Sequence, residues 1–136
     1  MSFKSRIQQN ARVISQLHRR IHETFAHRDD DEQSRAAWQD ACTAFHAQYE
    51  ELAFPCGTYT MRERLRAGDT EAIEYAIDFI EIRPYFFRSG YMYKDFLRVL
   101  KNCPLSDGQR KRYDLVKTQY DAYRDNRRLT GKRDAR

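Results

Sequence analysis

The fold is decided by residues 3–27, which read FKSRIQQNARVISQLHRRIHETFAH. Apolar side chains return in this stretch every three, four or seven positions, the spacing that puts them on one face of an α-helix. They are Ile7, Ile14, Leu17, Ile21 and Phe25. The stretch therefore predicts a long amphipathic helix, which should end near the acidic run at residues 29–32.

A second long helix is expected directly after this acidic run. Residues 32–53 carry an apolar stripe made of Trp38, Cys42 (or Ala41), Phe45, Tyr49 and Leu52. A short connection between two long amphipathic helices favours an antiparallel pair. No stretch of the chain shows convincing strand alternation. We therefore expect an all-α protein, a compact bundle or short array of five to six helices beginning with a long antiparallel helical hairpin.

The rest of the chain predicts four further helices, over residues 58–66, 70–82, 89–102 and 106–127. Proline and glycine mark the breaks between them. Asp69 suits the N-cap of the second of these helices. Ser106 and Gln109 have the spacing of a capping box at the start of the last one. We expect one helical domain over 1–128 and a flexible, basic C-terminal tail over 129–136.

The composition indicates the number of domains and the cellular compartment of the protein. Its 136 residues fit one domain. Its three cysteines are far apart and form no CxxC pair, which argues against a disulfide framework and favours a reducing compartment. No apolar run approaches the ~20 residues of a membrane-spanning helix, and the polar start shows no secretory signal peptide. We expect a cytoplasmic protein with no membrane association and no cofactor.

The positive charge is concentrated at the C-terminal end. Residues 106–136 hold ten Lys and Arg against five Asp and Glu, whereas residues 1–105 balance. Acids alternate with bases along most of this segment, which is typical of a solvated helical face. Only the last part has a positive excess that could attract phosphate groups. The candidate nucleic-acid contacts are Arg124, Arg127, Arg128, Lys132 and Arg133.

The least ordinary segment is residues 83–93, where arginines and aromatic rings surround Pro84 at the junction of two expected helices. Rings beside guanidinium groups bind single-stranded nucleic acid, and the same side chains anchor protein interfaces. The alternative interpretation is structural: Phe86 and Phe87 fill the core, and the tyrosines line its edge. The residues predicted to bind are Arg83, Tyr85, Arg88, Tyr91 and Tyr93.

Three histidines are weaker candidates for a metal site. His18 and His22 lie four residues apart on the first helix, and the hairpin geometry could bring His46 near His18. Three histidines on facing helices could hold zinc or iron, but di-iron sites in helical bundles need several carboxylates directed inward, and the acids here fall mainly on polar faces. We therefore expect polar histidines at the rim of the core and no bound metal.

Motifs for catalysis do not occur in the sequence. There is no GxSxG nucleophile motif and no phosphate-cradling glycine loop. With nine Tyr, eight Phe and one Trp, the sequence favours a non-catalytic protein–protein interaction module, a small helical scaffold or regulatory protein that uses an exposed aromatic and arginine surface. The alternative is a nucleic-acid-binding protein that uses the basic C-terminal helix and the 83–93 cluster. The identity of the protein partner and the oligomeric state stay open.

Overall fold

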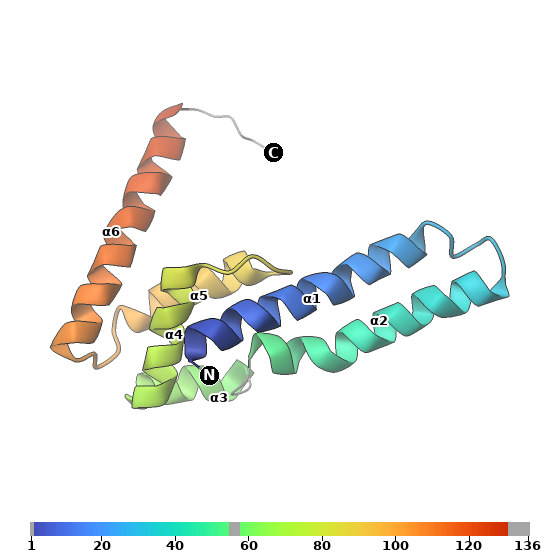
Figure 1. Cartoon of the computed structure of the whole chain (residues 1–136). Helices are drawn as coiled ribbons and strands as arrows, with labels where there is room; N and C mark the ends of the chain where they lie inside the picture. The colour runs from blue at the N-terminus through green and yellow to red at the C-terminus, as the bar shows by residue number, and fades with distance from the viewer. Residues whose placement is uncertain (1, 55–57, 131–136) are drawn as a thin grey trace.

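The computed structural model describes residues 2–54 and 58–130, and every regular element within these ranges is an α-helix (Figure 1). The all-α prediction is confirmed. The ends differ slightly from the expected ones: the first helix stops at Phe25, the fifth at Leu100, and the last continues to Thr130. The helices are α1 (Phe3–Phe25), α2 (Glu32–Ala53), α3 (Thr58–Arg66), α4 (Thr70–Ile82), α5 (Ser89–Leu100) and α6 (Asp107–Thr130).

Helices α1 and α2 form the expected antiparallel hairpin, side by side along most of their length (Figure 1). The Asp31 carboxylate caps α2 by accepting a hydrogen bond of 2.7 Å from the Ser34 N–H. At the open end, the Asn10 side-chain amide donates to the Leu52 carbonyl at 3.1 Å. These bonds fix the turn and the register of the pair.

Burial along the hairpin is uneven. Ile7, Ile14 and Phe45 are buried, as their positions in the two stripes predict. Toward the turn the stripes open to solvent: Leu17 and Ile21 are partly buried, and the Phe25 side chain is 45% exposed. The reason is geometric, because the far end of the hairpin extends beyond the other helices and each stripe there faces only its partner (Figure 1).

Helix α4 is the centre of the core. It packs against α1, α3, α5 and α6, so that nearly its whole circumference is covered. The Asp69 carboxylate caps it by accepting from the Ala72 N–H at 3.0 Å. Its buried face is wide, because Tyr75 and Phe79 lie inward beside the isoleucines. The buried residues of α4 are Ala72, Ile73, Tyr75, Ala76, Ile77, Phe79 and Ile80.

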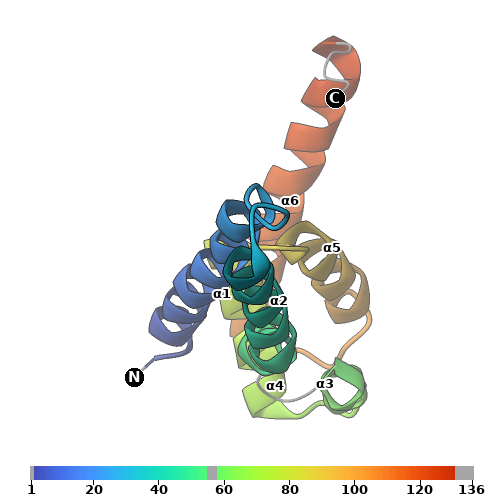
Figure 2. The same ribbon diagram turned by 90° about the vertical axis from the view of Figure 1, so that its right-hand side faces the viewer.

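Helix α6 begins with the predicted capping box. The Ser106 N–H donates to the Gln109 side-chain oxygen at 2.9 Å, and the Gln109 N–H donates to the Ser106 hydroxyl at 3.2 Å. Tyr113 and Val116 are buried against the core. The last two turns of α6 stand clear of the other helices in both views (Figures 1 and 2). The molecule is therefore a short helical array around α4, with the hairpin and α6 extending from it.

Two remaining expectations concern the membrane and the tail. No helix within residues 2–54 and 58–130 has both the length and the apolar character needed to cross a membrane. Of the expected tail, Leu129 and Thr130 belong to α6. Residues 131–136 lie outside the described part of the chain.

Candidate functional site

The loop between α4 and α5 has an unusual backbone. Arg83 and Arg88, at its two ends, both lie in the left-handed region, with φ of 52° and 68°. A side chain with a Cβ atom costs about 1 kcal/mol in that region, whereas glycine adopts it freely. The Arg83 N–H still closes α4 by donating to the Phe79 carbonyl at 2.8 Å. The loop thus presents arginine at both positions where glycine would fit with less strain.

Hydrogen bonds and one buried ring hold the loop against the core. Ser89 is buried, and its hydroxyl accepts from the Phe86 N–H at 3.0 Å while its own N–H donates to the Phe86 carbonyl at 2.9 Å. The Phe86 ring is only 8% exposed and meets Phe79 edge to face. The Tyr49 hydroxyl of α2 donates to the Phe87 carbonyl at 2.9 Å. Phe86 therefore fills the core, as the structural interpretation of this segment predicts.

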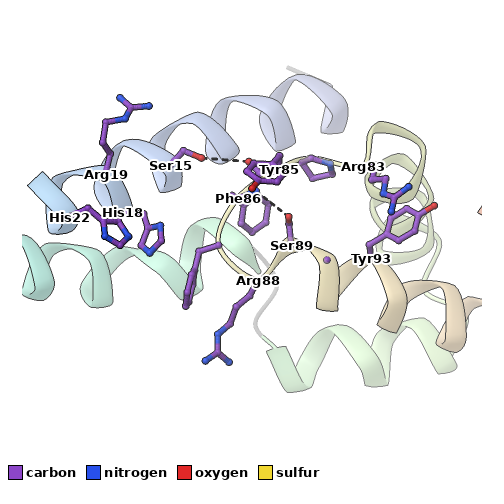
Figure 3. Close-up of a pocket in the computed structure, with 13 residues that line it drawn as sticks. Ser15, His18, Arg19, His22, Arg83, Tyr85, Phe86, Arg88, Ser89 and Tyr93 are labelled. Carbon is purple, nitrogen blue, oxygen red and sulfur yellow. Dashed lines mark hydrogen bonds between the residues drawn. The ribbon is translucent and has the colours of Figure 1, made fainter. Parts of the chain in front are cut away.

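A pocket of about 830 Å³ lies between this loop and α1 (Figure 3). On the α1 side, the Ser15 hydroxyl reaches the Tyr85 carbonyl at 3.5 Å. Aromatic and basic side chains line the pocket, and no carboxylate does. The lining residues are Ser15, His18, Arg19, His22, Arg83, Pro84, Tyr85, Phe86, Phe87, Arg88, Ser89, Gly90 and Tyr93; we call this site the loop pocket.

The arginines of the loop pocket lack acidic partners. Arg19, Arg83 and Arg88 form no ion pair with any residue of the described ranges. Other arginines do: Arg62 pairs with Asp95 at 2.9 Å, and Arg112 pairs with three acids of α4. In Figure 3 the three pocket guanidinium groups do not converge. The Arg19 group points away from the loop, the Arg83 group turns toward Tyr93, and the Arg88 group leaves on the side opposite Arg19.

The structure divides the five predicted binding residues. Arg83, Tyr85 and Arg88 lie together at the pocket, and the Tyr85 side chain is 92% exposed. Tyr91 is 77% exposed but lies outside the pocket, in a neighbouring hollow beside Phe54 and Met92 whose lining also includes Arg88 and Glu50. Tyr93 lines the pocket but is only 5% exposed, and burial raises the pKa of its hydroxyl. Tyr93 therefore contributes to the pocket wall and is not an exposed contact.

Arg83 connects the loop to α6. Its guanidinium carbon lies 4.5 Å from the centre of the Tyr93 ring and 5.3 Å from that of Tyr123, within cation–π range. Arg127 lies 5.8 Å from the same Tyr123 ring, and Arg124 lies 5.7 Å from the Tyr120 ring. Arg124 and Arg127, two of the candidate nucleic-acid contacts, therefore lie on the same Tyr-rich face of α6 that Arg83 contacts.

The other candidate nucleic-acid contacts are placed differently. Arg128 pairs with Asp125 at 3.8 Å, a contact between exposed side chains one helical turn apart. Lys132 and Arg133 lie outside the described residues. Acids and bases alternate along this part of α6 as expected, with Lys117 paired to Asp121 at 2.8 Å.

The histidines are brought together in part. The rings of His18 and His22 meet edge to face, with centres 4.7 Å apart. His46 lies on α2, the other helix of the hairpin, and its ring contacts that of the neighbouring Phe45. Burial and the neighbouring His22 lower the pKa of His18, which favours its neutral form. Within the described ranges, no three side chains of His, Cys, Asp or Glu are placed to hold a metal ion.

Sequence reasoning missed the contribution of α1 to the site. Ser15, Arg19 and the two histidines line the pocket, but the spacing of the apolar stripe shows only that His18 lies beside Ile14 and Ile21 on one face of α1 and that Arg19 lies outside that face. Which part of the α1 surface meets the loop depends on how residues 83–88 fold back over α1. The only sequence signal for this part of α1 was the i, i+4 spacing of His18 and His22, and that spacing suggested a metal site instead of a pocket.

Comparison with known protein families, with curated protein sequences and with solved structures finds no match for this chain.

Proposed function

We propose that this chain is a non-catalytic interaction module that binds another protein through the loop pocket. The observation that carries the proposal is the gathering of three arginines, none with an acidic partner among the described residues, around an aromatic floor and beside an almost fully exposed Tyr85. Arginine and large aromatic side chains supply most of the binding free energy at protein interfaces. A partner would cover the Tyr85 ring and give the guanidinium groups the acceptors they lack.

The strained backbone supports the same proposal. Left-handed non-glycine residues cluster at binding sites, where the side chain is needed despite its conformational cost. Arg83 and Arg88 both show this combination, at the two ends of one loop. Glycine at either position would relieve strain but would remove a guanidinium group from the pocket.

Photocrosslinking in cells of the native host tests the proposal. A photoreactive phenylalanine analogue at position 85 should crosslink a discrete protein, and the added substitution Arg83→Gly should lower the yield. The matched control carries the analogue at Leu115, which is 60% exposed on α6 and lies outside the pocket. Equal products from positions 85 and 115, or no protein product from position 85, would reject the proposal.

Nucleic-acid binding is the second candidate, and one observation favours it. The contact of Arg83 with Tyr123 makes the 83–93 cluster and the basic face of α6 neighbours. Binding of single- or double-stranded probes should then weaken steeply with salt, because neutralised phosphates release counterions. The double variant Arg124→Gln, Arg127→Gln should reduce both the affinity and the salt slope. A failure to shift either probe at low salt would remove this candidate.

A further inference from the structure

We infer that the loop pocket binds an acidic segment of the partner protein, with an apolar side chain on the aromatic floor and carboxylates on either side of it. The inference rests on the proposed function, because it specifies the chemistry of the partner at the same surface. It is carried by the charge of the pocket, by the directions of its arginines and by the burial of its rings.

Charge is the first argument. Three of the lining residues, Arg19, Arg83 and Arg88, carry a positive charge, and among the described residues no Asp or Glu lines the pocket. A smaller hollow of about 270 Å³ adjoins it, sharing Ser15, Arg19 and Tyr85 with the pocket and adding Arg12. A cleft lined by charge of one sign concentrates ligands of the opposite sign. The basic surface thus continues along α1, which fits a negatively charged chain segment.

The directions of the guanidinium groups exclude a single small anion as the fitting ligand. A phosphate or carboxylate held by several arginines needs their donors to converge on one point. Here the Arg19 and Arg88 groups point to opposite sides of the loop (Figure 3). Acceptors must therefore be spread along the ligand, as they are along a peptide with several Asp or Glu side chains.

Ring burial decides between a polypeptide and single-stranded nucleic acid. Stacked bases need the open faces of successive aromatic rings. Among the described pocket rings only Tyr85 is widely exposed, because Phe87 is partly buried and Phe86 and Tyr93 are 8% and 5% exposed. An apolar side chain needs only a hollow with an apolar floor, and about 830 Å³ is ample for it. The geometry favours the peptide.

Fluorescence anisotropy with defined peptides tests the inference on the full chain. The probes are labelled nine-residue peptides: one of glutamates with a central Phe, one with Ala replacing the Phe, and one with glutamines replacing the glutamates. Labelled oligothymidine is the fourth probe. The Glu–Phe peptide should bind most tightly, lose about tenfold in affinity when Gln replaces Glu, and weaken as salt rises.

Pocket variants supply the second comparison. Arg88→Gly and Arg19→Gln should each weaken binding of the Glu–Phe peptide roughly fivefold, the loss expected for one peripheral charge contact. Arg20→Gln is the matched control, because it removes the same charge from the next position of α1, which does not line the pocket. Circular dichroism of each variant shows whether it is folded.

The outcomes separate the inference from the function on which it rests. Equal binding of the Gln–Phe and Glu–Phe peptides would overturn the acidic ligand but leave a protein-binding pocket. Binding of oligothymidine alone, weakened in the pocket variants, would overturn both the inference and the proposed function. No binding by any peptide, or an equal loss in Arg20→Gln, would overturn the inference, while crosslinking at position 85 tests the function separately.

Discussion

Arg88 combines a left-handed backbone, with φ of 68°, with a charged side chain exposed at a pocket. It is also the residue just before α5, where its side chain makes no capping hydrogen bond. Glycine is well accepted at an N-cap and removes the left-handed strain. At the scale of a single residue, stability and the proposed binding therefore require different side chains.

Arg88→Gly should consequently leave the free energy of unfolding unchanged or raise it by up to about 1 kcal/mol, even though it removes a side chain. Urea unfolding followed by circular dichroism measures this. Arg20→Gly is the control, because the same change in the exposed middle of α1 should lower stability by about 1 kcal/mol. If the two variants lose stability equally, the left-handed strain at Arg88 is not significant and the support it gives to the proposed function disappears.

At the scale of elements, one arginine supplies the ion pairs between α6 and α4 in the described part of the chain. Arg112 binds Glu74 at 3.1 Å, Asp78 at 2.6 Å and Glu81 at 2.7 Å, and Lys4 of α1 also reaches Glu81 at 3.0 Å. Three carboxylates on one face of α4 would repel one another without this guanidinium group. The charged contact complements a small apolar one, made mainly by Tyr113 and Val116.

Arg112→Ala should lower the free energy of unfolding by roughly 2 kcal/mol, less than for a fully buried pair because the Arg112 side chain is partly exposed. Limited proteolysis should then cut within α6 before the rest of the chain. Arg128→Ala is the control, since its pair with Asp125 is exposed and should contribute little. Unchanged protease resistance of α6 in Arg112→Ala would contradict this account.

The same contact makes stability depend on pH. Hydrogen bonding by Arg112 lowers the pKa of Glu81 from about 4.5 to about 2. The folded protein then releases this proton more readily than the unfolded chain does. The resulting stabilisation is complete above pH 5 and is lost as the pH falls through 4.5 toward 2. At neutral pH it amounts to roughly 2 kcal/mol.

Glu81→Gln should therefore be less stable than the natural chain at pH 7 and should show a shallower loss of stability between pH 6 and pH 3. Urea midpoints across this range measure both effects. Glu71→Gln, which alters an exposed acid of the same helix, should keep the slope of the natural chain. Parallel pH curves for the natural chain and Glu81→Gln would show that Glu81 does not carry the linkage.

At the scale of the whole molecule, burial is concentrated around α4 and thins toward two ends. Apart from residues 1, 55–57 and 131–136, which the structure does not describe, the most buried helices are α4 and α5. At the hairpin turn and along the last turns of α6, most side chains are exposed. Local opening is easiest where few apolar contacts must be broken.

Hydrogen exchange followed by mass spectrometry should show this gradient. Amides of α4 and α5 should exchange slowest, and those of residues 26–31 and 124–130 should exchange fastest. The middle of the hairpin, near Ile14 and Phe45, should lie between the two. Uniform protection over all six helices would mean that the molecule opens as one cooperative unit and that the ends are held by contacts other than burial.

Local sequence patterns were sufficient to predict the helices, two of their caps and the starting hairpin. These depend on local physics: the spacing of Ile7 and Ile14, the carboxylate of Asp69 and the Ser106–Gln109 pair act within a few residues of where they stand. The sequence also marked residues 83–93 as unusual and offered a core position for Phe86, because composition is visible without coordinates.

Which residues of the 83–93 segment form the loop pocket depended on the tertiary fold. It buried Tyr93, placed Tyr91 in another hollow, and brought Arg19 and His18 to the loop from nearly 70 positions away in the chain. In the part of the chain that the structure describes, Arg83 has no acidic partner, whereas Arg112 forms ion pairs with three carboxylates. Such outcomes depend on how the helices cross and where the loop folds back, and these are set by the packing of all six helices together rather than by any local pattern.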